Sequence, residues 1–185
     1  MSAMVKVLAS VVAALDQAGI GHMISGSIAS ARYGEARATQ DIDIVIDPSA
    51  HQMEMLLPLL AETGMYVGDG SSALQSRSQF NVIDSASGWK VDLIIRRDRE
   101  YSLMEFDRRQ RASLLGVEVF LVTPEDSILS KLEWASASGS ERQLRDVVGL
   151  LKVQGSTLDW TYLEEWSQRL EVQDVLESSR LLAEG

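Results

Sequence analysis

Asp41 and Asp43 are the residues of this chain whose type and spacing are best suited to chemistry, because they lie at the start of the apolar run Ile42–Ile46. Alternate side chains of a β-strand share a face, so both carboxylates would project from one side while the isoleucines are buried on the other. Mg²⁺ prefers oxygen ligands, and phosphoryl transfer needs such a negatively charged clamp. The pattern therefore predicts a carboxylate site for divalent cations.

A third aspartate, Asp92, interrupts another apolar run, Val91–Ile95, and shares a face with Lys90 and Ile94. A lone buried carboxylate is costly. We therefore predict that this strand lies beside the Asp41 strand, so that three carboxylates converge on the cation. Two alternatives stay open: Asp92 is exposed or paired with an arginine at the end of a hairpin, or the three acids form a purely structural Ca²⁺ or Mg²⁺ site.

Gly26 and Ser27 precede Asp41 by fifteen and fourteen residues and follow a short apolar segment, which we predict to be a strand. At a strand-to-helix turn, free backbone N–H groups and the positive end of the helix dipole attract phosphate, and glycine permits close approach. The alternative is an ordinary glycine turn followed by a serine N-cap.

The length of 185 residues suits one well-filled core, or one core with a helical appendage. Residues 1–18 predict an amphipathic helix rather than a signal peptide, and no apolar run reaches about 18 residues, so we expect a soluble, cytoplasmic protein without a membrane span. With no cysteine and two isolated histidines, thiolate chemistry and Cys- or His-based zinc sites are excluded. Any metal must be held by oxygen.

The formal charge of −10 and the pI near 4.7 disfavour extensive nucleic-acid binding. Six arginines nevertheless fall within sixteen residues. They are either part of a solvated, salt-bridged helix or the lining of a local groove for phosphates. These residues are Arg96, Arg97, Arg99, Arg108, Arg109 and Arg111.

The order of predicted elements is that of an α/β (α+β) protein, a mixed sheet flanked by helices with a helical extension at its C-terminal end. We expect residues 1–122 to form the core and residues 123–185 to be a helical region packed on it. Strands are predicted at 22–25, 41–46, 79–83, 90–95 and 117–122, and helices at 4–17, 28–33, 48–63, 101–111, 124–137, 141–153, 159–170 and 172–182, with a loop or weak strand at 64–72.

Lys131 stands on the same helical face as the apolar stripe Ile128, Leu132 and Ala135. It either reaches inward or lays its stem along the core edge and keeps its amine in water. On the next helix, Asp146 lies almost opposite the apolar side and faces either a cleft or solvent.

Three segments together resemble the nucleotidyltransferase superfamily with the polymerase-β-like minimal fold: Gly26-Ser27, Arg37 to Asp43, and Lys90 to Asp92. The segments Thr123 to Lys131 and Arg142 to Asp146 resemble the branch that includes the toxins of abortive-infection systems and uncharacterised bacterial relatives.

This resemblance implies that Gly26 and Ser27 hold the triphosphate of an NTP such as ATP, and that Asp41 and Asp43 ligate Mg²⁺ in a two-metal site. Asp92 would be the third acid, as a metal ligand or as the base for the attacking hydroxyl.

Other positions match less specific parts of the pattern. Lys131 would contact the phosphates and take part in catalysis, and Arg37 and Asp146 would belong to the nucleotide-binding positions. Toxin relatives often carry an additional acid just before the final Asp, where this chain has Arg142 and Gln143. The metal ligands are unaffected by that departure, which bears instead on whether the chain shares the substrate choice of the toxins.

The expected activity is Mg²⁺-dependent transfer of an NMP from an NTP to a hydroxyl of an unidentified acceptor, with release of pyrophosphate. The acceptor would be a protein, an RNA end or a small molecule. The alternative is a non-catalytic nucleotide-binding or partner-binding module on the same fold, antitoxin-like, for which a second protein is the partner.

Overall fold

A computed structural model describes residues 2–34 and 39–185 and divides them into two compact units. The first unit contains the chain up to Ile28 and the segment that ends at Leu121. The second contains the remainder of helix α2 (Gly26–Tyr33), from Ala29 onward, and residues Val122–Gly185. The expectation that residues 123–185 pack on residues 1–122 stays a prediction.

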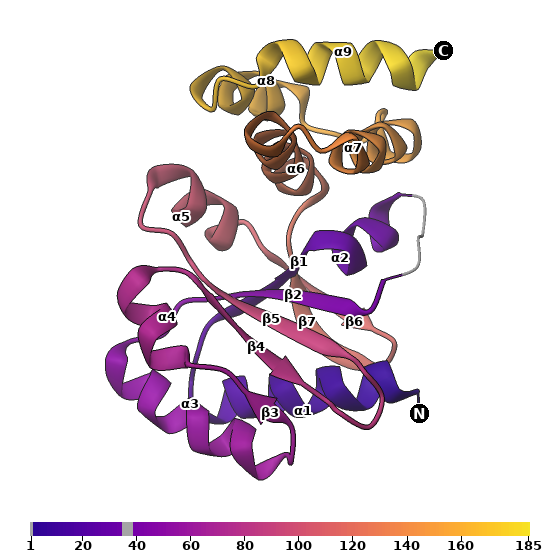
Figure 1. Ribbon diagram of the computed structural model, residues 1–185. Helices are drawn as coiled ribbons and strands as arrows, with labels where there is room; N and C mark the ends of the chain where they lie inside the picture. The colour runs from indigo at the N-terminus through magenta and orange to yellow at the C-terminus, as the bar shows by residue number, and fades with distance from the viewer. Residues whose placement is uncertain (1, 35–38) are drawn as a thin grey trace. The chain divides into compact units, whose positions relative to one another are not determined.

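The first unit is built on a seven-stranded mixed sheet with the order β3-β4-β5-β2-β1-β7-β6 (Figure 1). Strands β2 and β5 are parallel, as are β1 and β7, and the other neighbours are antiparallel. The strands are β1 (His22–Ser25), β2 (Asp41–Ile46), β3 (Tyr66–Val67), β4 (Gln79–Ile83), β5 (Lys90–Ile95), β6 (Gln110–Leu114) and β7 (Val117–Leu121). This architecture confirms the predicted mixed sheet with flanking helices.

Alternation along the central strands gives the sheet one apolar face. Ile42, Ile44 and Ile46 of β2 are completely buried, while the residues between them are partly exposed. Helices α1 (Ala3–Gln17) and α3 (Ala50–Glu62) lie along this side of the sheet in Figure 1. Burying one such side chain contributes about 1.5–3 kcal/mol, so this face stabilises the unit and leaves the opposite face for polar groups.

Local capping fixes where these two helices start. The Ser2 side chain accepts a hydrogen bond from the Val5 amide at the start of α1. Ser49 and Gln52 form a reciprocal capping box at the start of α3. Both devices satisfy amides that would otherwise lack partners in the first helical turn.

Two segments of the first unit differ from the prediction. Helix α5 (Glu100–Asp107) ends before residue 111, and Gln110–Leu114 is instead the edge strand β6, joined to β7 by Leu115 and Gly116 with φ of +52° and +85°. Residues 64–72, predicted as a loop or weak strand, hold the short strand β3 in agreement with the second alternative, but they also hold the start of helix α4 (Gly70–Ser76), which was not predicted. In both cases pairing with a neighbouring strand or packing on a helix decides the structure of a weakly patterned segment.

The second unit is helical, as predicted, and consists of α6 (Pro124–Ser138), α7 (Glu141–Gln154), α8 (Trp160–Arg169) and α9 (Gln173–Glu184) together with the end of α2. Thr123 caps α6 by accepting from the Asp126 amide, Pro124 occupies its first turn, and Gly139 ends it at φ +69°. In the part of the chain that the structure describes, no helix is both long and apolar enough to cross a membrane.

Candidate functional site

The pairing of β2 with β5 brings the three predicted acids to one face of the sheet. In this parallel pair Asp43 lies opposite Asp92, and Asp41 lies opposite Lys90. The Asp92 side chain is 8% exposed, whereas the Asp41 side chain is 49% exposed. The strand adjacency that the apolar runs predicted is therefore present, and the carboxylates range from buried to half-exposed across the same surface.

Gly26 approaches Asp43 so closely that a side chain there would require the Asp43 carboxylate to move. Strand β1 pairs antiparallel with β2, with Ser25 opposite Asp43, and Gly26 follows at φ +62°. A Cβ atom on Gly26 would lie 1.9 Å from Asp43 Oδ2. Helix α2 begins at Gly26 itself, so Ser27 lies inside its first turn rather than before it, and its side chain is buried.

Lys90 places an ammonium group between two of the acids. Its Nζ lies 2.9 Å from Asp92 Oδ2 and 3.4 Å from Asp41 Oδ1. The hydrogen bond to Asp92 raises the pKa of Lys90 above its ordinary value, against the opposing effect of burial, and the charges of both aspartates add to the increase. The sequence places Lys90 on this face but gives no sign that it bridges the acids.

Asn81 of β4 holds the second oxygen of Asp92. Its Nδ2 donates a 2.8 Å hydrogen bond to Asp92 Oδ1, since the two residues are opposite each other in the β4–β5 pair. Both oxygens of this buried carboxylate thus have a donor, which offsets its desolvation. Sequence reasoning missed Asn81; the available signal was an amide in the middle of a strand whose neighbours are apolar.

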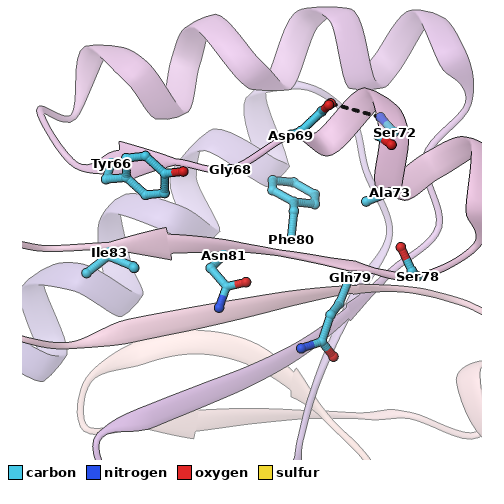
Figure 2. A pocket seen from close by; sticks show the side chains of 10 residues that line it. All are labelled: Tyr66, Gly68, Asp69, Ser72, Ala73, Ser78, Gln79, Phe80, Asn81 and Ile83. Atoms are coloured by element: carbon cyan, nitrogen blue, oxygen red, sulfur yellow. Dashed lines mark hydrogen bonds between the residues drawn. The ribbon is translucent and has the colours of Figure 1, made fainter.

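A pocket of about 340 Å³ lies beside this cluster, along β3, β4 and the start of α4 (Figure 2). Figure 2 shows Asn81 and Phe80 pointing to opposite sides of β4. Asn81 is among the residues that line the pocket, and its side-chain amide also donates to Asp92 of the acid cluster. The lining residues are Tyr66, Gly68, Asp69, Ser72, Ala73, Ser78, Gln79, Phe80, Asn81 and Ile83.

The donor chemistry of Asp41, Asp43 and Asp92 fits a hard cation such as Mg²⁺, which takes carboxylate oxygens. Within residues 2–34 and 39–185, however, no three His, Asp or Glu side chains are already arranged as a metal-holding group. The Lys90 ammonium is a positive charge that contacts two of these acids, Asp41 and Asp92. These three aspartates are the residues that would hold the cation.

Lys131 and Asp146 form a buried ion pair within the second unit. Lys131 Nζ lies 2.8 Å from Asp146 Oδ2 and donates a 3.1 Å hydrogen bond to Gln143 Oε1. The two charged side chains are 7% and 11% exposed. Lys131 thus reaches inward rather than to water, and Asp146 faces a partner rather than solvent. Their predicted place in one site with the acids stays a prediction, and Arg37 lies outside the described residues.

A second polar network in this unit centres on Asp126, which is completely buried. The Thr123 hydroxyl donates to Asp126 Oδ2 and the Tyr162 hydroxyl donates to Asp126 Oδ1, each at 2.6 Å. Glu125 accepts from the Asp159 amide at 3.0 Å. The network joins the starts of α6 and α8, which the sequence had predicted as separate helices without this link.

Several of the six clustered arginines have partners in the first unit. Arg96 Nη2 lies 3.0 Å from Asp47 Oδ2, at the ends of β5 and β2. The guanidinium of Arg109 stacks at 4.1 Å on the ring of Phe106, and that of Arg99 lies 5.3 Å from the centre of the Tyr101 ring. These contacts favour a structural use of the arginines, although helix α5 (Glu100–Asp107) contains none of the six.

No protein-family model matches the chain, and no curated protein matches it either. Solved structures do. ANT(2'')-Ia in complex with adenylyl-2''-tobramycin is 16% identical, with a TM-score of 0.61, over 92% of this chain and 98% of that one. The lincosamide antibiotic adenylyltransferase LnuA, lincomycin-bound, is 14% identical, with a TM-score of 0.54, over 80% and 96%.

A third structure is an antigenic nucleotidyltransferase-like protein from Paracoccidioides brasiliensis, 19% identical with a TM-score of 0.53 over 93% of this chain and 91% of that one. All three likenesses extend over most of both chains, and they agree with the resemblance drawn from the Gly-Ser and Asp-x-Asp segments. The chain has the nucleotidyltransferase fold.

Proposed function

We propose that this protein is a Mg²⁺-dependent nucleotidyltransferase that moves an NMP from an NTP to a hydroxyl group and releases pyrophosphate. The observation that carries the proposal is the convergence of Asp41, Asp43 and Asp92 on one face of the sheet, with Gly26 packed against Asp43. The fold supports it, because one similar structure is bound to adenylyl-2''-tobramycin and another is a lincosamide antibiotic adenylyltransferase bound to lincomycin.

Each acid has a proposed task in the transfer. Asp41 and Asp43 would hold the metal, and Asp92 would either complete its ligand set or accept the proton of the attacking hydroxyl. The acceptor oxygen forms a bond to the α-phosphorus as the bond to the β-phosphate oxygen breaks, and pyrophosphate leaves. Bound Mg²⁺ supplies charge neutralisation at the phosphate oxygens, so the protein contributes mainly positioning and electrostatics.

Gly26 and Ser27 are proposed to hold the triphosphate, because the glycine backbone reaches the acid cluster and α2 begins there. Lys131, Asp146 and Arg37 are proposed to contribute to nucleotide binding on the strength of the sequence resemblance alone. For Lys131 this requires that its ammonium exchange at least part of its pairing with Asp146 for phosphate.

For the acceptor, we propose a small hydroxyl-bearing molecule. The names of the similar structures pair this fold with adenylyl-tobramycin and with lincomycin. The formal charge of −10 also favours a neutral or cationic acceptor over an RNA end. ATP is the first donor to test, because the product in one of these structures is adenylylated.

The test measures pyrophosphate release from each NTP with Mg²⁺, in the presence of pools of hydroxylated small molecules. Asp43→Asn should abolish release without unfolding the chain. Asp98→Asn, the same chemical change at an exposed position after β5, is the matched control and should stay active. Full activity of Asp43→Asn would refute the assignment, and a metal- and nucleotide-dependent rise in Tm without turnover would favour a non-catalytic binding module.

A further inference from the structure

Lys90 and a divalent cation would use the same oxygen atoms. The Lys90 ammonium contacts Asp92 Oδ2 at 2.9 Å and Asp41 Oδ1 at 3.4 Å. In the β2–β5 pair Asp43 lies opposite Asp92 and two residues from Asp41, so the ammonium contacts two of the three proposed metal ligands, both next to the third. The Lys90 ammonium, a monovalent cation of the chain itself, thus occupies the place in the cluster that a divalent cation would take.

The environment of Lys90 allows it to leave. Its side chain is 33% exposed, whereas that of Asp92 is 8% exposed. Lysine has a flexible four-carbon stem and a strongly hydrated head, so moving its ammonium into water costs little. Asp92 stays in place, because Asn81 donates to its other oxygen, Oδ1. An exchange of cations would therefore involve one oxygen of Asp92 and leave the carboxylate oriented.

We propose that Lys90 is a built-in counter-ion of the acid cluster, which a divalent cation must displace, and that Lys90 thereby lowers the affinity of the cluster for free metal. The inference rests on the proposed function, which assigns the metal to these three acids. Without metal, Lys90 relieves the mutual repulsion of the carboxylates. With metal, its ammonium is repelled, because like charges about 4 Å apart interact unfavourably even in water.

Metal binding in the absence of nucleotide is the direct test. We would titrate wild type, Lys90→Gln, Lys90→Arg and Lys6→Gln with Mn²⁺, follow the free Mn²⁺ signal by electron paramagnetic resonance, and compete with Mg²⁺. Lys90→Gln should bind about tenfold more tightly than wild type, since one repulsive charge is removed. Lys90→Arg keeps the charge and should bind like wild type. Lys6 is exposed on α1, so Lys6→Gln controls for net charge.

A measurement on the unaltered protein keeps the test independent of how the variants fold. Nitrogen-edited NMR spectra of lysine ammonium groups should show a hydrogen-bonded Lys90 signal, assigned by its loss in Lys90→Arg. Addition of Mg²⁺ should shift that signal or broaden it away. A Lys90 signal that is unchanged at saturating Mg²⁺ would overturn the proposal.

The outcomes separate this inference from the function on which it rests. If Lys90→Gln binds metal no more tightly than wild type while Asp43→Asn abolishes binding, the cluster holds metal and the counter-ion role is wrong. If neither wild type nor Lys90→Gln binds metal, both the metal assignment and the counter-ion role fail. Tighter binding that appears equally in Lys6→Gln would be a general charge effect and would also overturn the role of Lys90.

Discussion

The two units each contain a cluster of charged side chains, and the clusters differ in how their charges are balanced. In the first unit, Asp41 and Asp92 share the ammonium of Lys90, and two of these three side chains are at least one third exposed. In the second, Lys131 and Asp146 form a pair that is about nine-tenths buried. A buried pair cannot lose a partner cheaply, whereas a half-exposed cluster can exchange one cation for another.

Because of this difference, we expect mutations in the two clusters to have different effects. Changes in the acid cluster of the first unit should affect ligand binding and activity more than folding. Changes in the polar groups of the second unit should affect the free energy of unfolding. Three predictions test that division, and a fourth concerns a buried histidine of the first unit.

The largest expected effect is on activity, from Asp41→Asn. This carboxylate is proposed to hold the metal, and a metal contributes several kcal/mol of transition-state stabilisation, so the rate of pyrophosphate release should fall by at least about a hundredfold. Because the side chain is 49% exposed, the free energy of unfolding should change by less than about 0.5 kcal/mol. Urea denaturation and the pyrophosphate assay give the two numbers. A large loss of stability with retained activity would show that Asp41 serves folding and not activity, the opposite of the role expected for the acid cluster.

Lys131→Met should destabilise the protein by about 3 kcal/mol, because it leaves Asp146 as an unpaired charge in a mostly buried position. The double variant Lys131→Met, Asp146→Leu should recover much of that loss, which urea denaturation can measure. If Lys131 instead acts mainly on the triphosphate, the single variant would stay folded and lose affinity for NTP. That result would contradict the structural role of the Lys131–Asp146 pair and support the role of Lys131 drawn from the sequence resemblance.

Tyr162→Phe should cost about 2 kcal/mol of unfolding free energy, because the Tyr162 hydroxyl donates to the completely buried carboxylate of Asp126. Tyr66→Phe is the matched control: Tyr66 is 61% exposed, and loss of its hydroxyl should be nearly neutral. Equal effects in thermal or urea unfolding would show that the Asp126 network is not a source of stability.

His22, in the first unit, should make the free energy of unfolding depend on pH. Burial lowers the pKa of His22 below its ordinary value of 6.5, against raising contributions from the Ile20 carbonyl and Asp16, while Arg109 lowers it further. The unfolded chain therefore binds more protons than the folded one below about pH 6.5, so stability is complete above that pH and is lost as pH falls through the window beneath it.

The expected slope from this one group is at most about 1.4 kcal/mol per pH unit. Urea denaturation of wild type and His22→Gln between about pH 5.5 and 7.5 isolates it, because the carboxylates titrate in both proteins alike. Parallel stability curves for the two proteins would show that His22 does not stay neutral in the folded state.

The acid cluster was accessible from sequence because it follows from local rules. Alternation predicts that Asp41 and Asp43 share a face, and the cost of burying Asp92 in an apolar run predicts a neighbour that compensates for it. The Gly26-Ser27 spacing predicts a turn near the acids. The roles of these residues in catalysis go beyond those rules and stay proposals.

What the sequence did not predict depends on strand register and tertiary packing. Asn81 reaches Asp92 only because β4 and β5 pair with those residues opposite each other, and the same holds for Asp41 and Lys90 in β2 and β5. Residues 110–114 have no strong apolar period, and pairing with β7 makes them a strand rather than the end of a helix. The orientation of Lys131 stayed open because an amphipathic stem suits both environments.

The close approach of Gly26 to Asp43 has a genetic consequence. Because any Cβ at position 26 would meet Asp43 Oδ2 at 1.9 Å and the backbone has φ of +62°, Gly26→Ala should fold poorly. Asp43→Gly removes the obstructing atoms and should act as a second-site suppressor that partly restores folding, while the proposed metal ligand is lost. If codons 26 and 43 were randomised together in one library, selection for the amount of folded protein would therefore enrich different residue pairs from selection for activity.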